Sequence, residues 1–342
     1  MYALRKIAAG SGNMLYSKVS EPVPKEKEVK IRVLFTGICG SDLHAFKGEY
    51  NKVIPLTLGH EFVGEVVAVG KDVSKIGVGT IVSSETTFEV CEKCEYCLAE
   101  EYNLCSSRKG LGTQIDGSFA EYLIAKEDRC HVIPASVEPK IAALLEPLAC
   151  CVHAAVEKTT VEPHEKIAVF GPGPIGLIMS LVLKAYGAEV ILIGISKDEQ
   201  RLALAKNMGI DYVINSQKSD LLAQINQLTE KQGVSQVFEC SGSIQAVHSA
   251  FKIVRKKGKV IQEGLFSQDM NAIDMSLFIH KEIDYLGSRT QKPSSWKTAL
   301  HLLETHKINL EPVISKIMPL RDWEQAFALA MSAEELKILM VP

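Results

Sequence analysis

The sequence has little that would tie it to a membrane or to a nucleic acid. Its longest apolar run, around residues 175–183, is interrupted by Ser180 and followed by Lys184, so it is too short for a membrane span. The first residues, MYALRKIAAGSGNML, contain no apolar core of signal-peptide length. The formal net charge of -3 gives no sign of a basic surface for nucleic acid or lipid. We therefore expect a cytoplasmic protein whose partners are small molecules or copies of itself, with no nucleic acid and no membrane.

Internal repeats, low-complexity tracts and flexible linkers are also missing from the sequence. The 342 residues are 46% hydrophobic and 23% charged, which is the profile of an ordinary globular protein. A chain of this length is long enough for two domains, each with its own core.

The cysteines do not indicate a disulfide framework, because they are nine, an odd number, and the expected compartment is reducing. Four of them lie in CEKCEYCLAEEYNLC, residues 91–105, with the spacing C-x2-C-x2-C-x7-C. A short loop with this spacing can present four thiolates to one tetrahedral zinc ion. Because four thiolates complete the coordination, we expect a structural zinc at Cys91, Cys94, Cys97 and Cys105, and a catalytic metal elsewhere.

A second group of metal-binding side chains lies upstream, in GICGSDLHAFKGEYNKVIPLTLGHEFVGEVVAVG, residues 37–70. Cys39, His60 and Glu61 offer a thiolate, an imidazole and a carboxylate, a set that suits a catalytic zinc with an open position. Taken alone, Cys39 and His60 can equally be a buried thiol and a core histidine. The end of the segment, EFVGEVVAVG, also shows the residue alternation of a strand and contains turn glycines, so much of the segment can be explained by structure without a metal site.

The stretch KIAVFGPGPIG, residues 166–176, runs from an apolar strand into a glycine turn and then into a helical repeat. Gly171, Gly173 and Gly176 form G-x-G-x-x-G, and Pro174 and Ile175 lie within it. In this context the motif indicates a dinucleotide-binding turn, in which the helix N-terminus faces the pyrophosphate. Including 167–170, we expect strands of a doubly wound parallel sheet at 190–193, 212–214, 236–239, 259–262 and 283–286.

These motifs occur in the order found in the zinc-dependent medium-chain alcohol and polyol dehydrogenases, which the chain resembles along nearly its whole length. The shared segments are GHEFVGEVVAVG, the four-cysteine lobe, LLEPLACCVHA at 144–154, and GPGPIG. The resemblance is greatest to the sorbitol dehydrogenase branch. It implies an α/β chain with a GroES-like, β-rich catalytic domain at 1–150, to which 288–342 returns, and a Rossmann domain at 151–287. It also implies an active site in the cleft of the catalytic domain against the Rossmann domain.

The resemblance also implies roles for individual residues. Cys39 and His60 would ligate the catalytic zinc, and Glu61 and Glu146 would join them directly or through water. Ser41 resembles the hydroxyl that begins the family's proton relay, and Asp42 the carboxylate that orients the histidine ligand. His44 either extends the relay or is a surface histidine. Cys150 and Cys151 are expected to pack in the interior.

The expected reaction is oxidation of a secondary hydroxyl on a polyol, sugar or sugar-acid derivative, with the reverse reduction of the ketone, by NAD or NADP. Arg289 resembles a substrate-binding arginine, with a salt bridge at the domain junction as the structural alternative. Thr290 and Ala45 stand where sorbitol dehydrogenases have tyrosine, so another substrate than sorbitol is expected. Threonine and butanediol oxidation are the alternative activities.

Two other classes of protein remain open on the sequence alone. A quinone reductase of the same superfamily would leave Cys39, His60, Glu61 and Glu146 without a purpose. A non-enzymatic regulator that binds zinc and nucleotide would need only the four-cysteine lobe. Relatives are dimers or tetramers joined at a Rossmann sheet edge, so we expect a homodimer or homotetramer, with the strand at 283–286 as the candidate edge.

The cofactor preference is predicted from the residues at and beyond the end of the second Rossmann strand. An NAD-specific strand usually ends in Asp or Glu, but EVILIG ends at Gly194, and Ser196, Lys197 and Arg201 come next. We therefore expect NADP to be accepted, with Lys197 or Arg201 at its 2′-phosphate. The alternative is that both cations are solvated helix residues. Further cofactor contacts are expected at Gly264, Leu265, Ser288 and Arg289.

Overall fold

The computed structural model describes residues 1–49, 53–268, 270–332 and 334–342 and divides into two compact units. The first unit contains Met1–Ala149, Gln291–His306 and Val313–Pro342, and the second contains Cys150–Thr290 and Lys307–Pro312. The sequence-based boundaries placed all of 288–342 with the first domain. The structure instead assigns 288–290 and 307–312 to the second unit, and the latter stretch carries the buried side chains of Ile308 and Leu310.

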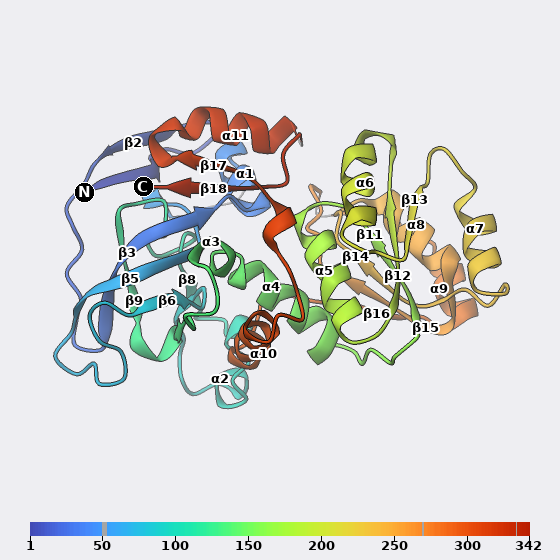
Figure 1. Cartoon of the computed structure of the whole chain (residues 1–342), viewed down its shortest axis with the longest axis horizontal. Coiled ribbons are helices and arrows are strands. Elements are labelled where there is room, and N and C mark those ends of the chain that lie inside the picture. Colours follow the sequence, from blue (N-terminus) through green and yellow to red (C-terminus); the bar gives the residue numbers. More distant parts are fainter. Residues whose placement is uncertain (50–52, 269, 333) are drawn as a thin grey trace. The chain divides into compact units, whose positions relative to one another are not determined.

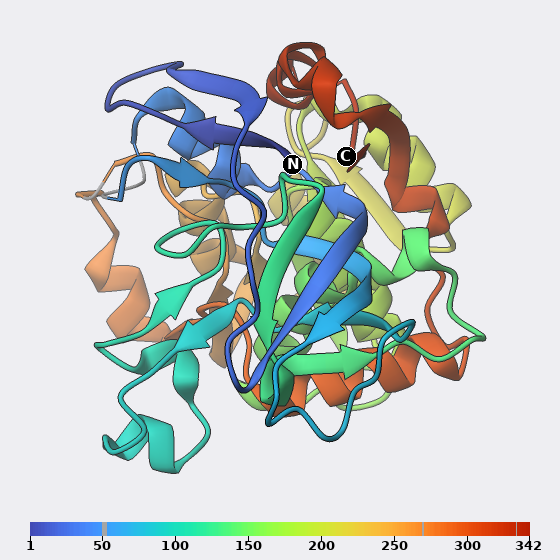
Figure 2. The same ribbon diagram turned by 90° about the vertical axis from the view of Figure 1, so that its left-hand side faces the viewer.

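The first unit is built on a mixed sheet in which the long strand β3 (Glu28–Gly37) is central (Figures 1 and 2). The remaining strands of this sheet, in spatial order around β3, are β10 (Cys130–Val132), β6 (Ile81–Ser84), β5 (Glu61–Val69), β18 (Lys337–Val341) and β17 (Ile314–Pro319), with β9 (Tyr122–Lys126) also paired to β3. Smaller sheets are formed by β2 (Met14–Lys18), β1 (Tyr2–Lys6) and β4 (Leu56–Thr57), and by β7 (Thr87–Glu89) and β8 (Lys109–Gly110).

The alternation of apolar residues explains why β3 lies at the centre. Val29, Ile31 and Val33 point to the same side and are buried in one cluster with Phe62 and Val66 of β5. The antiparallel pairing of the two strands extends to their ends, where Gly37 lies opposite Glu61. This register brings the residues just beyond Gly37 next to those just before Glu61.

Short helices connect and flank these strands. They are α1 (Gly40–Lys47), α2 (Glu95–Leu98), α3 (Pro139–Ala142), α4 (Leu145–Val152), α10 (Pro293–Glu304) and α11 (Trp323–Ser332). The boundary between the units falls inside α4, after Ala149. The segment around α2 projects from the first unit as a separate lobe, drawn in teal in Figures 1 and 2.

The second unit has the parallel sheet that the sequence predicts. Its described strands follow the order β13 (Tyr212–Asn215), β12 (Glu189–Gly194), β11 (Lys166–Phe170), β14 (Val234–Glu239), β15 (Val254–Gln262) and β16 (Asp284–Gly287), all paired in parallel. This is the order of a doubly wound dinucleotide-binding fold, with the reversal between β11 and β14. Strand β15 begins five residues before the predicted 259, because the exposed Arg255–Lys257 segment hides its start in the sequence.

Helices cover both faces of this sheet in Figure 1. They are α5 (Pro174–Ala185), α6 (Glu199–Asn207), α7 (Leu221–Leu228), α8 (Ile244–Ile253) and α9 (Met275–Lys281). Phe251 of α8 belongs to the core cluster on one side and lies edge-on to Tyr285 of β16. Within the described residues, no helix has both the length and the apolar character needed to cross a membrane.

Candidate active site

Strand ends bring together the residues predicted to ligate a catalytic zinc. Cys39 precedes α1, and His60 and Glu61 lie where the chain enters β5. One ligand atom from each of Cys39, His60 and Glu61 lies within 4.8 Å of the other two. Gly37 makes room for this arrangement, because a Cβ atom at that position would lie 2.3 Å from Oε2 of Glu61. A thiolate, an imidazole and a carboxylate at these spacings fit a zinc ion that keeps one position open.

Asp42 organises the histidine end of this cluster. Its Oδ2 accepts a hydrogen bond from the Cys39 backbone N–H at 3.0 Å, and its Oδ1 lies 3.9 Å from Nδ1 of His60. Burial alone would lower the pKa of His60, but Asp42, followed by Cys39 and Glu146, raises it well above the ordinary value. Nδ1 of His60 is buried without a hydrogen-bond partner, and Ser41 Oγ lies 3.5 Å from Nε2. The charge of Asp42 therefore favours the protonated imidazole, whose other nitrogen lies near the predicted relay hydroxyl, and the orienting role of Asp42 stays a prediction.

A lysine that the sequence analysis missed is paired with Glu61. Lys337 of β18 is 3% exposed, and its Nζ donates to Oε1 and Oε2 of Glu61 at 2.8 and 2.7 Å and to the Ile38 carbonyl at 3.0 Å. Burial alone would lower the pKa of Lys337, but Glu61, followed by Cys39, raises it above the ordinary value. The signal in the sequence is a lysine inside the apolar strand KILMV. A buried carboxylate needs such a partner whenever no metal neutralises it.

Glu146 lies in the first turn of α4 and is 5% exposed. Its Oε1 accepts a hydrogen bond from Nε2 of Gln291 at 2.9 Å. Its charge contributes to the raised pKa values of both His60 and Lys337, but the set of mutually close ligand atoms among the described residues does not include it, so its contact with a catalytic metal stays a prediction. Cys151 is fully buried, as expected for a packing residue.

Two other predicted residues, His44 and Arg289, are not part of the set of mutually close ligand atoms among the described residues. His44 Nδ1 lies 2.6 Å from Oε2 of Glu49, at the exposed end of α1, so the extension of the relay through His44 stays a prediction. Arg289 belongs to the second unit, and its contact with substrate likewise stays a prediction.

The four cysteines of the lobe form the second metal-binding group. The ligand atoms of Cys91, Cys94, Cys97 and Cys105 all lie within 4.8 Å of one another. All are free thiols, and Sγ of Cys94 and Cys97 are 3.5 Å apart, well beyond a disulfide bond. The backbone N–H groups of Lys93 and Cys94 lower the pKa of Cys91 to about 6, whereas burial and neighbouring thiols raise the pKa of Cys97 to about 12. Only a cation can hold four such sulfurs together as thiolates, so the geometry fits a structural zinc.

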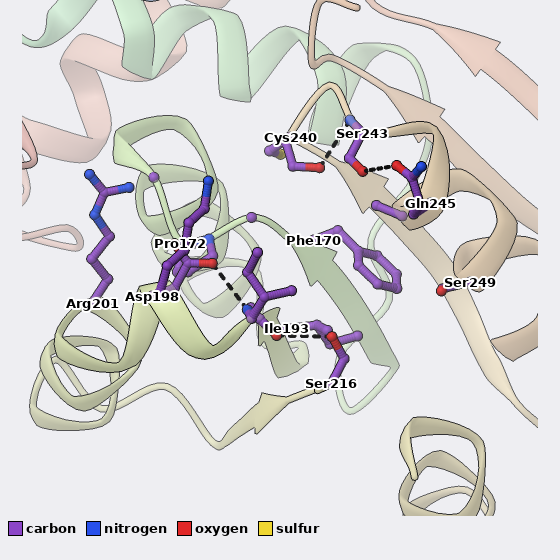
Figure 3. A pocket seen from close by; sticks show the side chains of 17 residues that line it. Phe170, Pro172, Ile193, Asp198, Arg201, Ser216, Cys240, Ser243, Gln245 and Ser249 are labelled. Carbon is purple, nitrogen blue, oxygen red and sulfur yellow. Dashed lines mark hydrogen bonds between the residues drawn. The ribbon is translucent and has the colours of Figure 1, made fainter. Parts of the chain in front are cut away.

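The glycine turn opens a cavity of about 400 Å³ at the carboxyl ends of the strands of the second unit (Figure 3). Gly171 has φ +93°, and a Cβ at Gly176 would lie 1.8 Å from the Gly171 carbonyl oxygen. Both positions therefore require glycine, which lets α5 begin directly against the turn. Gly173 precedes the first residue of α5, Pro174, so the N-terminus of this helix opens toward the cavity that a dinucleotide pyrophosphate would occupy.

One end of the cavity carries the residues predicted to meet a 2′-phosphate. Gly194, Lys197, Asp198, Arg201 and Ser216 line it. Asp198, beside Arg201 in Figure 3, is 8% exposed, and its Oδ2 accepts a hydrogen bond from the Ile195 backbone N–H at 3.0 Å. The carboxylate among these lining residues is therefore bonded to the backbone through one oxygen. Burial lowers the pKa of Arg201 overall, against the charge of Asp198, which raises it.

A buried glutamate that the sequence analysis missed shapes the opposite wall. Glu239, fully buried at the end of β14, accepts hydrogen bonds from the backbone N–H groups of Ser241 and Gly242 at 2.8 and 2.9 Å. Gln262 donates to the same carboxylate at 2.6 Å. A Cβ at the predicted cofactor residue Gly264 would lie 2.3 Å from the Gly242 nitrogen, so the loops after β14 and β15 touch.

The predicted contacts Leu265 and Ser288 lie just beyond the ends of β15 and β16. Leu265 is 65% exposed, and its carbonyl oxygen approaches Gly242. Ser288 donates its backbone N–H to the Gln262 carbonyl at 2.9 Å. Both residues therefore lie at the same edge of the sheet as the glycine turn, and their contacts with the cofactor stay predictions.

The chain matches two family models over most of its length and known proteins over nearly all of it. Residues 25–135 match the alcohol dehydrogenase GroES-like domain, and residues 174–305 match the zinc-binding dehydrogenase family. D-arabitol-phosphate dehydrogenase from Enterococcus avium is 45% identical over 99% of this chain and 97% of its own length. Sorbitol dehydrogenase from Halalkalibacterium halodurans is 44% identical over 100% of this chain and 99% of its own length.

Solved structures agree with these matches. A zinc-binding dehydrogenase from Sinorhizobium meliloti 1021 bound to NADP has a TM-score of 0.91 at 28% identity, covering 100% of this chain and 99% of that one. Galactitol-1-phosphate dehydrogenase from Escherichia coli has a TM-score of 0.91 at 28% identity and covers 100% of both chains. With its glycine turn, its two groups of zinc-binding side chains and these matches, the chain belongs to the zinc-dependent medium-chain polyol dehydrogenases, enzymes that use zinc and NAD(P).

Proposed function

We propose that this chain oxidises a secondary hydroxyl of a polyol or polyol phosphate at a zinc ion held by Cys39, His60 and Glu61, with NADP as the preferred oxidant. The observation that carries the proposal is the mutual approach of these three ligand atoms within 4.8 Å. When bound, zinc acts as a Lewis acid that lowers the pKa of the substrate hydroxyl, and the nicotinamide accepts the hydride.

The side chains around the metal ligands have separate tasks in this proposal. Ser41, whose Oγ is 3.5 Å from Nε2 of His60, relays the proton that the substrate hydroxyl loses: it takes that proton while donating its own hydroxyl proton onward, toward His44 or solvent. Asp42 holds the imidazole in its orientation, and Lys337 holds the carboxylate of Glu61. Glu146, whose Oε1 accepts a hydrogen bond from Gln291, provides a second carboxylate to the metal site in this proposal.

The substrate class is tested by steady-state kinetics on purified enzyme. We expect turnover of arabitol, of another polyol than sorbitol, or of a polyol phosphate, with kcat/KM at least about tenfold above the values for threonine and 2,3-butanediol, a difference of roughly 1.4 kcal/mol in transition-state binding. Comparing each polyol with its phosphate ester shows whether the substrate is phosphorylated. A preference for threonine or butanediol would replace the polyol assignment, and no turnover of any secondary alcohol would refute it.

The division between catalytic and structural zinc is tested by metal analysis of two matched Cys→Ser variants. Wild type should contain about two zinc ions per chain. Cys39→Ser should lose one ion and its activity while keeping the fold, because only an exchangeable catalytic site is changed. Cys94→Ser should lose the other ion and be less stable in thermal unfolding, because structural zinc contributes folding free energy. Identical metal loss and identical melting in the two variants would contradict separate roles.

The ion pair at Glu61 is tested by Lys337→Met. This change leaves a buried carboxylate unpaired, so the zinc-free variant should lose about 3–5 kcal/mol of unfolding free energy relative to zinc-free wild type. Zinc should restore part of this loss by neutralising Glu61. The control is Lys316→Met on the neighbouring strand β17, where the pair with Glu335 is partly exposed and should be worth at most about 1 kcal/mol. Urea denaturation of wild type and both variants, each with and without zinc, measures the free energies of unfolding. Equal losses in Lys337→Met and Lys316→Met would contradict a larger contribution from the buried pair.

Cofactor preference is tested at the two cations. Wild type should show a higher kcat/KM for NADP than for NAD, because Lys197 and Arg201 line the cavity and β12 ends at Gly194 without a carboxylate. The double variant Lys197→Ala, Arg201→Ala should lose on the order of tenfold or more with NADP and little with NAD, as expected for a charge-assisted hydrogen bond. Lys206→Ala, in the last turn of α6, is the control. A wild-type preference for NAD that survives the double change would leave both cations as solvated residues.

A further inference from the structure

Gln291 is a buried amide in contact with a carboxylate of the proposed active site. It is 4% exposed, and its Nε2 donates to Oε1 of Glu146 at 2.9 Å. The two residues are 145 positions apart in the chain. A hydrogen bond from a neutral donor restricts the rotation of a carboxylate without adding charge to a cluster that already contains Lys337 and His60.

Gln291 is itself held by side chains next to the four-cysteine lobe. Its amide nitrogen also lies 3.3 Å from Oγ1 of Thr86, which is 5% exposed. Arg108 donates from Nη2 to the same Thr86 oxygen at 2.9 Å and from Nε to Thr87 Oγ1 at 2.8 Å. Because Oγ1 of Thr86 accepts a hydrogen bond from Arg108, the hydroxyl proton of Thr86 can be donated to Oε1 of Gln291, 3.5 Å away.

The network begins three residues after a structural metal ligand. The backbone N–H of Arg108 donates to the Cys105 carbonyl at 3.0 Å, and Cys105 belongs to the four-cysteine group. All of these residues lie in the first unit. An ordered hydrogen-bond path therefore runs from the lobe through Arg108, Thr86 and Gln291 to Glu146.

We propose that Gln291 is a positioning residue that orients Glu146 toward the catalytic metal site, and that Thr86 and Arg108 keep Gln291 in place from the structural-zinc lobe. This inference rests on the proposed function, because it takes Glu146 to face the metal. It differs from the role of Lys337, which provides a charge to Glu61 at both oxygens. Groups that orient metal-facing carboxylates typically affect metal affinity or activity by about 10- to 100-fold.

The test uses Gln291→Met, which keeps the length of the side chain and removes the amide. Gln236→Met is the matched control. Gln236 is also 4% exposed, and its Nε2 also donates to a carboxylate, Oε2 of Glu165, at 3.0 Å. It belongs to the second unit, whereas all the proposed zinc ligands belong to the first. Each full-length protein, with zinc in the four-cysteine site, is titrated with Co²⁺. The visible absorption of Co²⁺ reports the geometry of the catalytic site, and the titration reports its affinity.

We expect Gln291→Met to bind Co²⁺ about 10- to 100-fold more weakly with an altered spectrum, and to lose kcat by a similar factor while KM for the cofactor is unchanged. Gln236→Met should keep the wild-type spectrum and affinity. If Gln291→Met does not fold, Thr86→Val serves instead, with a smaller shift in the same direction. A wild-type spectrum and affinity in the Gln291 or Thr86 variant would overturn the inference alone. A wild type without any second metal site would overturn the proposed function and the inference together.

Discussion

The buried ion pair between Lys337 and Glu61 is the constraint around which the first unit is organised. Strand β5 carries Glu61 opposite Gly37 at the end of β3, and β18 pairs with the same end of β3, so its first residue, Lys337, reaches the carboxylate. A carboxylate this deep in the protein requires a cation, and the last strand of the chain supplies one. The site where zinc is proposed to bind therefore exists as a compensated cluster before any metal enters it.

Polar partners around this cluster compensate charges that burial would otherwise make costly. Asp42 faces His60, Lys337 faces Glu61, and Gln291 faces Glu146. His60 and Glu61 therefore each face a charged partner, whereas Glu146 faces a neutral one. Such networks contribute little net stability, but each partner limits the orientations that a metal ligand can adopt.

In the second unit the main constraint is different: its backbone has to approach a large anionic ligand closely. Gly171 and Gly176 allow the turn to touch the first turn of α5, and Glu239 gathers the N–H groups of the loop on the opposite wall. Asp198 accepts a hydrogen bond from the Ile195 N–H, and the cations Lys197 and Arg201 line the same cavity. Here backbone geometry, more than buried charge, determines the shape of the site.

The sequence by itself determined the features that depend on short spacings: the four cysteines of the lobe, the glycine turn after β11 and the strands of the parallel sheet. It also indicated Cys39, His60 and Glu61, because each lies beside a strand end or glycine that marks a turn. It did not reveal the start of β15, where exposed charges mask the strand, nor the partners Lys337, Glu239 and Gln291. Lys337 is 276 residues from Glu61, and Gln291 is 145 residues from Glu146. Only the tertiary structure decided these pairings, because a buried charge is satisfied by whichever strand the fold brings beside it, at no fixed distance along the chain.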